Sequence, residues 1–187
     1  VANNENQKNF LFKNEGDFNF TRILNDPIVN ENGYYASSGW GDYDNDGDLD
    51  MFVTQAYGPP NTPLLNHLYK NNLVESGNPV FEKITDGEIV NDAGYSFGFA
   101  WADWDADGDL DLFAARTYAE NENNSAYLNT GNANKWIVIK LSGASATKIS
   151  PISSKVKVRA ILNGNPVWLT RTVDGQSGYC GQNMDLH

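Results

Sequence analysis

Short apolar runs, broken every few residues by glycine, asparagine or aspartate, dominate this 187-residue chain. Tyr34–Trp40 and Tyr95–Trp101 are rich in aromatic and small residues, which suits a crowded inner β-strand. Asp50–Thr54 and Asp111–Ala115 each carry a short apolar run bounded by turn residues, and we predict a second strand there. Because no apolar spacing of 3.6 residues is sustained, the pattern predicts an all-β chain.

The same pattern returns with a period of 61 residues. Phe20 and Phe81 are 61 residues apart, and each precedes a tryptophan, Trp40 or Trp101, by 20 residues. Four short strands in each repeat are typical of a β-propeller blade. The remaining predicted strands are third strands at His67–Lys70 and Ala126–Leu128 and fourth strands at Val80–Ile84 and Phe18–Leu24.

Two aspartate-rich loops, Asp42–Asp50 and Asp103–Asp111, agree at seven of nine positions and start 61 residues apart. An Asn-x-x-aromatic-x-Asn element occurs three times, at Asn9–Asn14, Asn66–Asn71 and Asn124–Asn129. Only eight residues precede the first copy, too few for a loop, so we expect the chain to begin inside a repeat. The repeats predict a partial, calcium-binding β-propeller of about two and a half blades over residues 1–131.

The pattern changes near Asn132, where we place a domain boundary. Lys135–Leu141 reads as a strand of different character, because it replaces the Phe-x-x-Ile that the repeats would place there. A segment rich in serine, alanine and threonine follows, and then the alternating strand Lys155–Ile161. We therefore predict a small β-rich domain over residues 132–187, which we expect to continue beyond His187.

The spacing of the aspartates predicts two calcium sites. Calcium prefers six to eight oxygen ligands, and an Asp-x-Asp-x-Asp-Gly-x-x-Asp loop offers carboxylates at positions 1, 3, 5 and 9 with a backbone carbonyl at position 7. Glycine at position 6 allows the sharp turn. The predicted residues are Asp42, Asp44, Asp46, Asp48 (by its carbonyl) and Asp50 in the first loop, and Asp103, Asp105, Asp107, Asp109 (by its carbonyl) and Asp111 in the second.

Two other interpretations of these loops fail. An EF-hand needs a bidentate glutamate at position 12, which is Val53 in one loop and Ala114 in the other. A solvated acidic turn without a ligand would bring four carboxylates together with no cation, and would do so twice with glycine in register. The side chains of Asp48 and Asp109 are expected to point outward while their carbonyls face the metal.

Charge and composition limit the kinds of partner that the chain can be expected to bind. The formal charge is −11, which argues against nucleic acid and anionic membranes, although ten of the 24 acidic residues belong to the two loops. No apolar run is long enough to span a membrane. The single cysteine, Cys180, excludes an internal disulfide.

No catalytic constellation stands out, and we expect no enzyme activity. His67 is more readily explained by packing, and Cys180 lies in a glycine-rich turn with no basic residue close in sequence. The loop aspartates could serve as glycosidase carboxylates, but calcium explains their spacing better. Trp40, Trp101 and Trp104 are expected in the core of the blades because of their repeat positions.

The two loops with their flanks, Trp40–Val53 and Phe97–Phe113, closely resemble the FG-GAP/VCBS repeats of integrin α-type β-propellers. The tail, with Trp136–Leu141, Val156–Arg159 and Gly175–Asn183, resembles an ASPIC/UnbV domain. The resemblance implies a secreted, cell-surface or periplasmic protein that acts in adhesion or ligand binding. The alternative is a non-catalytic, carbohydrate-recognising part of a larger polysaccharide-active enzyme.

A protein or glycan ligand, if one binds, is expected on the face opposite the calcium loops. The turns Gln55–Leu65 and Thr117–Asn123 lie there in an up-and-down blade, and we expect Tyr57 and Tyr118 to contribute. Two complete repeats and part of a third cannot close a ring, since propellers need about four to eight blades. We therefore expect self-association through open blade edges, or else marginal stability and a strong dependence on calcium.

Overall fold

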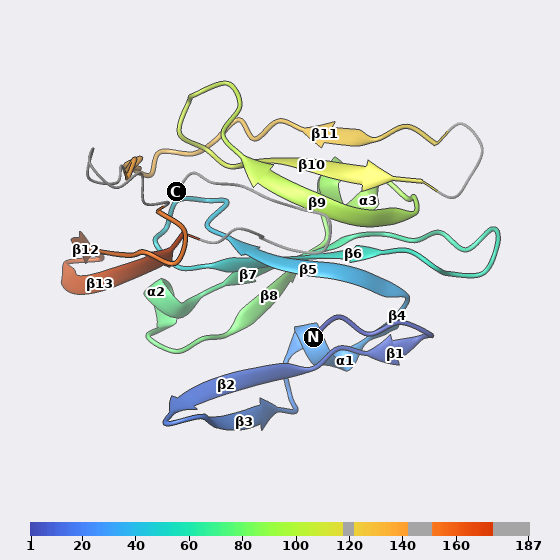
Figure 1. Ribbon diagram of the computed structural model, residues 1–187, viewed down its shortest axis with the longest axis horizontal. Coiled ribbons are helices and arrows are strands. Elements are labelled where there is room, and N and C mark those ends of the chain that lie inside the picture. The colour runs from blue at the N-terminus through green and yellow to red at the C-terminus, as the bar shows by residue number, and fades with distance from the viewer. Residues whose placement is uncertain (118–121, 142–150, 174–187) are drawn as a thin grey trace.

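The computed structural model describes residues 1–117, 122–141 and 151–173. These residues form β-strands in several separate sheets and three helices of a single turn, so the all-β prediction is confirmed. Figure 1 shows the sheets stacked on one another, with the strands of neighbouring sheets running in similar directions. Tyr118 and Cys180 lie outside the described residues.

The central sheet has the strand order of a propeller blade. β5 (Tyr35–Gly41), β6 (Asp50–Gln55), β7 (His67–Asn71) and β8 (Phe81–Ile84) follow one another in space as they do in sequence. All neighbours pair antiparallel. The four predicted strands of this repeat are therefore present, each within one or two residues of its expected bounds.

The next repeat builds a three-stranded sheet from β9 (Ser96–Ala102), β10 (Asp111–Arg116) and β11 (Ser125–Tyr127). Within the described part of the chain no fourth strand joins it. The first partial repeat forms the hairpin of β2 (Leu11–Gly16) and β3 (Asn19–Ile23). β3 covers most of the predicted strand Phe18–Leu24.

Two apolar clusters lie on the two faces of the central sheet. Phe52 and Leu68 pack with Phe99 and Trp101 of the next sheet on one face. Met51, Val53, Tyr35, Tyr69 and Phe81 pack with Ile28 on the other face. Every residue of β6 is buried, as expected for a strand covered on both sides. The sheets are thus held together by interleaved side chains.

The core assignment of the tryptophans is correct for only one of the three. Trp101 is 4% exposed because it lies between the central sheet and its own sheet. Trp40 is 43% exposed: it packs against Phe81 and lines an open cavity together with Val167 and Trp168. Trp104 occupies loop position 2 and is 45% exposed. Equivalent positions in the repeat therefore differ in burial because different partners cover them.

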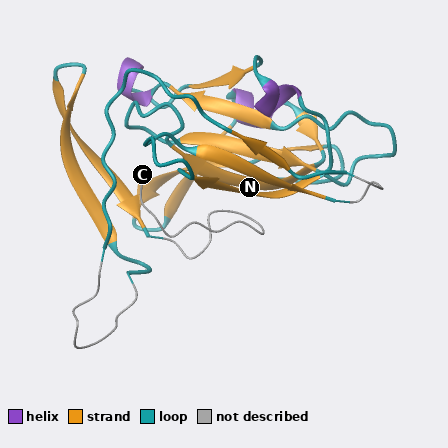
Figure 2. Cartoon of the chain, turned by 90° about the horizontal axis from the view of Figure 1, so that it is seen from above, coloured by secondary structure: helices purple, strands orange, loops and turns teal. Residues whose placement is uncertain are grey.

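The C-terminal part is a long hairpin of β12 (Lys155–Leu162) and β13 (Asn165–Thr172), which stands beside the stacked sheets in Figure 2. The strand predicted at Lys135–Leu141 is wrong: within it only Ile139 forms an isolated bridge. Its apolar side chains instead line a cavity against the hairpin. They make contacts there without the continuous backbone ladder of a strand.

Short elements complete the described chain. They are β1 (Gln7–Lys8), which pairs with β4 (Asn32–Gly33), and the helices α1 (Pro27–Asn30), α2 (Leu73–Ser76) and α3 (Glu88–Asn91). Asp26 caps α1 by accepting a hydrogen bond from the backbone N–H of Ile28. Among the described residues, no helix has the length and apolar character needed to span a membrane.

Candidate metal centre

Both aspartate-rich loops connect the first and second strands of their sheets, and both lie at the same end of the stack in Figure 1. Their backbones match. Position 4 is left-handed in each loop, with φ of 55° at Asn45 and 62° at Ala106. Position 6 has φ of 103° at Gly47 and 92° at Gly108, a conformation that disfavours any residue with a side chain. The shared spacing therefore folds into one shared loop shape.

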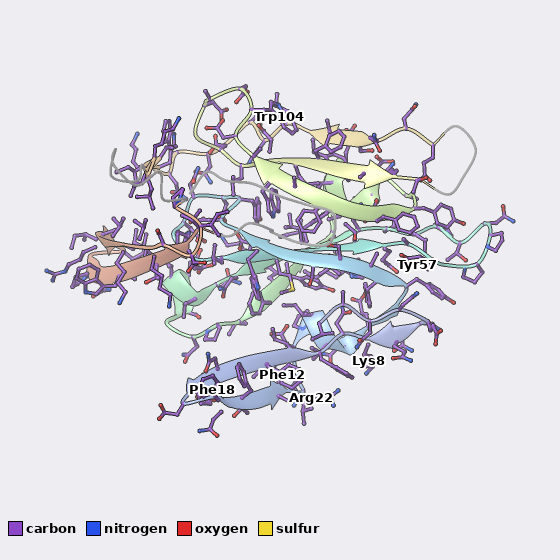
Figure 3. The ribbon with its side chains drawn as sticks, in the orientation of Figure 1. Lys8, Phe12, Phe18, Arg22, Tyr57 and Trp104 are labelled. Atoms are coloured by element: carbon purple, nitrogen blue, oxygen red, sulfur yellow. The ribbon has the colours of Figure 1, made fainter. Side chains whose placement is uncertain are left out.

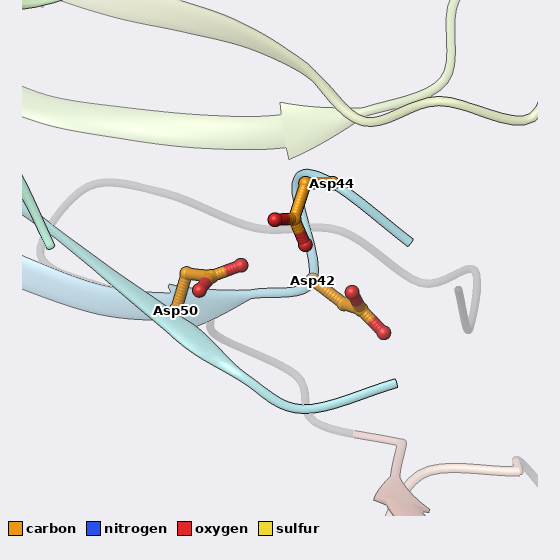
Figure 4. Close-up of side chains that lie close together, drawn as sticks. All are labelled: Asp42, Asp44 and Asp50. Carbon is orange, nitrogen blue, oxygen red and sulfur yellow. The ribbon is translucent and has the colours of Figure 1, made fainter. Parts of the chain in front are cut away.

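The first loop brings together the carboxylates at positions 1, 3 and 9, whose side chains lie close together in Figure 4. One oxygen each from Asp42, Asp44 and Asp50 lies within 4.8 Å of the others. Two oxygens bound to the same calcium ion at 2.3–2.6 Å are at most about 5.2 Å apart. The arrangement therefore has the dimensions of a calcium ligand set.

The second loop repeats this arrangement at the same three positions. One oxygen each from Asp103, Asp105 and Asp111 also lies within 4.8 Å of the others. Position 5 differs from positions 1, 3 and 9 in both loops. Asp46 groups instead with Asp48 and Glu75, and Asp107 Oδ1 accepts a hydrogen bond from the backbone N–H of Asp109.

The position 9 aspartates connect the loops to the sheets. Asp50 Oδ1 accepts from the backbone N–H of Asn71 at 2.8 Å, and Asp50 Oδ2 accepts from that of Tyr43 at 3.2 Å. Asp111 makes the equivalent bonds to Asn129 and Trp104, at 2.8 and 3.1 Å. Each carboxylate therefore ties its own loop to the end of the third strand and fixes one side of the ligand cluster.

The asparagine element has a role that the sequence alone did not reveal. The Nδ2 of its last asparagine donates to the carbonyl at loop position 8: Asn71 to Leu49 and Asn129 to Leu110, both at 3.2 Å. Its first asparagine accepts from the backbone at the end of the second strand, Gln55 for Asn66 and Arg116 for Asn124. The element closes each sheet around its loop. The similar spacing between each loop and the asparagine element that follows it was the sequence signal that could have indicated this role.

Lys70 is a second feature that sequence analysis missed. Its ammonium group donates to Asp44 and also pairs with Asp46 at 3.0 Å and with Glu75 at 3.1 Å. Burial acts to lower the pKa of Lys70, but these hydrogen bonds outweigh it and raise that pKa. The first loop thus has a protein cation beside its carboxylates.

Arg171 of β13 reaches the same loop from the C-terminal hairpin. Its Nη2 lies 2.8 Å from Asp42 Oδ2. Burial raises the pKa of Asp42 to about 6, although the Arg171 charge acts in the opposite direction. Burial likewise raises the pKa of Asp50 to about 8, with the nearby charges of Asp44 and Asp46 adding to the effect.

The side chain at position 7 does not point outward in the first loop. Asp48 is 5% exposed, and its Oδ2 accepts a hydrogen bond from the backbone N–H of Val74 in α2. The expectation is wrong there because α2 covers the loop. Asp109 is partly buried, and its Oδ1 accepts from the Nδ2 of Asn45 in the first loop.

His67 is buried between Gln55 and Tyr69, with ring nitrogens 3.2 Å from Gln55 Nε2 and 2.9 Å from the Tyr69 hydroxyl. Burial lowers its pKa to about 4. These contacts agree with the packing role that the sequence favoured for His67.

Comparison with known proteins gives a family match for the first part of the chain. A model of the FG-GAP-like repeat matches residues 1–53, a range that includes the whole first loop. Residues 1–53 carry an FG-GAP-like repeat. The more specific resemblances to integrin α-type propellers and to the ASPIC/UnbV domain remain predictions.

Two curated relatives are similar over a longer stretch. Cartilage acidic protein 1 of mouse is 28% identical to the chain over 140 residues, which cover 74% of this chain and 20% of that protein. The human protein of the same name gives the same identity and coverage. The chain therefore spans about a fifth of the length of the curated relatives it matches.

Proposed function

We propose that this chain is a calcium-binding part of an extracellular, cell-surface or periplasmic recognition protein, with no catalytic role of its own. The observation that carries the proposal is the duplicated cluster, in which positions 1, 3 and 9 of both loops bring carboxylate oxygens within 4.8 Å of one another. The FG-GAP-like repeat and the similarity to cartilage acidic protein 1 support an extracellular binding module. The ligand and the adhesive role are part of the proposal.

A bound cation would satisfy the carboxylate oxygens of the first loop better than their present contacts do. Asp44 Oδ1 is buried and has no hydrogen-bond partner among the described residues. A buried carboxylate oxygen without a partner is costly, and an ion at the centre of the cluster would satisfy it. Bound calcium would supply the positive charge that lets these carboxylates stay ionised side by side.

The chain itself supplies the rigid support for such an ion. Asp50 and Asp111 are fully buried and hydrogen-bonded to the backbone on both oxygens, so their ligand positions are fixed before an ion arrives. Of the other two ligand positions, Asp42 is buried and Asp44 half-buried in the first loop, whereas Asp103 is half-buried and Asp105 exposed in the second. An occupied site would therefore lock the first, second and third strands of one sheet together.

Isothermal titration with calcium tests this proposal, using Asp44→Asn and Asp105→Asn as a matched pair at loop position 3. We expect two sites in the unaltered chain and one in each variant. Affinity on the order of 10⁻⁴–10⁻³ M is typical of extracellular modules. The proposal is wrong if calcium produces no binding heat and a chelator leaves the melting temperature unchanged.

Recognition of a protein or glycan is proposed at the opposite end of the strands. Figure 1 places the β6–β7 connection, and the end of β10, at the end away from the calcium loops. Tyr57 projects there in Figure 3, is 48% exposed, and packs edge-to-face on Phe97 of the next sheet at 4.8 Å between ring centroids. This contact holds an exposed aromatic ring in one orientation, which lowers the entropic cost of binding.

A glycan array together with a pull-down of extracellular proteins tests this assignment. Tyr57→Ala should reduce binding, while Trp104→Ala, a similarly exposed aromatic residue beside the second calcium loop, should not. Equal effects of the two variants would contradict the assignment. Selective glycan binding would favour an accessory role in a polysaccharide-active protein over protein adhesion.

Self-association is proposed at the N-terminal hairpin. Phe12, Phe18 and Phe20 are 45%, 97% and 60% exposed, and the first and second of them project from the hairpin in Figure 3. A cluster of exposed aromatic residues on one hairpin is typical of an interaction surface. Light scattering on the 187-residue chain should detect oligomers, and a monomer at tens of micromolar would contradict the proposal.

A further inference from the structure

We infer that the two loops bind calcium as a coupled pair, and that Asn45 is the residue that couples them. The inference rests on the proposed function, because it presupposes that both loops bind the ion. It goes beyond that function because Asn45 is not a predicted ligand. We assign to this residue of the first loop an influence on the calcium affinity of the second loop.

Two side-chain amides link the loops directly. The Nδ2 of Asn45, at position 4 of the first loop, donates to the Gly108 carbonyl at 3.1 Å and to Asp109 Oδ1 at 2.6 Å. In the other direction, the Nδ2 of Asn129, which also donates to Leu110 of the second loop, donates to the Tyr43 carbonyl at 2.7 Å. The first loop therefore holds the backbone of the second through Asn45, and the asparagine element of the second repeat holds the backbone of the first through Asn129.

The contacts fall on the residues whose conformation matters most for binding. Gly108 and Asp109 are positions 6 and 7 of the second loop, where the sharp turn is made and where the predicted carbonyl ligand lies. Asn45 lies between Asp44 and Asp46, so any ordering of these two ligands also orders the amide that holds the second loop. Closing one loop on its ion thus lowers the entropic cost of closing the other.

The second loop has no equivalent residue reaching onward. Its position 4 is Ala106, whose methyl group cannot donate a hydrogen bond, although the backbone φ of 62° is nearly that of Asn45. The asparagine at position 4 is therefore not required for the shape of the loop. Its amide is free to serve the contact between loops, and Asn45→Ala recreates a loop that this chain already contains.

Coupling of this kind should be positive. Each ion would be offset by three carboxylates of its own loop, so an occupied loop would not carry excess positive charge toward its neighbour. At an ionic strength near 0.15 M the Debye length is about 8 Å, which further limits repulsion between the ions. Coupling between two sites in one protein is commonly in the range of about 5–150-fold.

A double-mutant cycle on the full 187-residue chain tests the inference by calcium titration. Asp105→Asn removes the second site and leaves the first one to be measured alone. In the unaltered chain, losing the second site should weaken the first by about fivefold or more. In the Asn45→Ala background, the same loss should change the affinity of the first site by less than about twofold.

Asn45→Asp is the second test variant, because it keeps the size of the side chain but sets a carboxylate against Asp109. It should make the coupling negative, so that losing the second site strengthens the first. A purely structural role for Asn45 would lower both affinities and leave the coupling unchanged. Two independent sites in the unaltered chain, or coupling that survives in Asn45→Ala, would overturn the inference; absence of calcium binding would instead overturn the proposed function.

Discussion

The two aspartate loops have the same sequence spacing and the same backbone shape, but their surroundings differ. The first is covered by α2 and the C-terminal hairpin, and Lys70 and Arg171 pair with its carboxylates. The second is more open, with Asp105 and Asp107 exposed, and no ion pair between described residues reaches it. Leu128 occupies the place in its asparagine element that Lys70 has in the first repeat.

The shape of each loop and the neutralisation of its carboxylate charge depend on different residues. The backbone bonds to Asp50 and Asp111 are the same in both loops, so the loop shape does not depend on the neighbours. Neutralisation does depend on them: the first loop has protein cations nearby, whereas the second would rely on the metal. Calcium should therefore matter more to the second loop than to the first.

The largest expected effect on stability comes from removing the position 9 aspartate, which makes the same backbone hydrogen bonds in both loops. Asp111→Ala would leave the backbone N–H groups of Trp104 and Asn129 without their carboxylate acceptor. Hydrogen bonds to a charged group contribute about 1.5–3 kcal/mol each, so we expect a loss of about 3–6 kcal/mol in the free energy of unfolding. Asp50→Ala should also destabilise the chain, but by less in chelator at neutral pH, because the raised pKa of Asp50 leaves its carboxyl group largely uncharged there. Urea denaturation with and without calcium measures both.

The control for this prediction is Asp105→Ala, which removes an exposed ligand from the same cluster. It should reduce calcium binding while leaving the melting temperature in chelator almost unchanged. If Asp111→Ala and Asp105→Ala destabilise the chain equally in chelator, the position 9 aspartates are not the structural support described above.

Most of the fold could be predicted from the sequence because the repeats carry redundant signals. Alternation, turn residues and a fixed period placed the strands of the central sheet within one or two residues. The failures occur where burial depends on a distant neighbour. Trp40 and Trp101 are equivalent in sequence, yet Trp101 is buried between two sheets while Trp40 faces an open cavity. Lys135–Leu141 is apolar enough for a strand, but in the structure its apolar side chains line a cavity and only Ile139 forms an isolated bridge.

The sequence predicted the carboxylates within each loop but not the contacts that the loops make with other parts of the chain. The aspartate spacing located the three carboxylates that converge in each loop. Lys70, Arg171 and Asn45 were missed, because their contacts depend on how separate strands and loops pack. Arg171 lies 129 residues from Asp42 in sequence, and no local pattern connects the two.

The second prediction concerns pH and the first loop. Burial raises the pKa of Asp50 to about 8 and that of Asp42 to about 6, above the values near 4 of an unfolded chain. The folded state therefore binds more protons between about pH 4 and pH 8, so without calcium its stability should rise as the pH falls through that range. Calcium competes with these protons. We expect the affinity of the first loop, isolated by Asp105→Asn, to fall about tenfold or more from pH 8 to pH 6.

The control for the pH prediction is the free energy of unfolding in chelator, followed over the same range. It should change in the opposite direction to the calcium affinity. Stability that falls together with affinity as the pH decreases would show that the buried carboxylates are ionised in the cation-free chain.

The third prediction concerns deuterium exchange of the backbone amides in the two loops when calcium is removed. In chelator, backbone amides of residues 103–111 should exchange with deuterium more than those of residues 42–50, since Lys70 and Arg171 pair with the first loop and no ion pair among the described residues reaches the second. A difference of about tenfold in exchange rate corresponds to about 1.4 kcal/mol in local opening free energy. With calcium added, protection of the two loops should become similar. Equal exchange in chelator would contradict the role assigned to Lys70 and Arg171.

The smallest expected effect comes from exchanging the residue that distinguishes the two repeats. Lys70→Leu gives the first loop the residue that the second repeat has at Leu128, and it removes the ammonium group that calcium would displace from Asp44 and Asp46. Calcium affinity of the first loop should rise a fewfold, and protection in chelator should fall only part of the way to that of the second loop, because Arg171 still pairs with Asp42 and partly exposed ion pairs contribute modestly. Leu128→Lys is the reciprocal control and should weaken calcium binding at the second loop. An affinity of the first loop that falls in Lys70→Leu would mean that the lysine holds the ligands in place for the ion and does not compete with it.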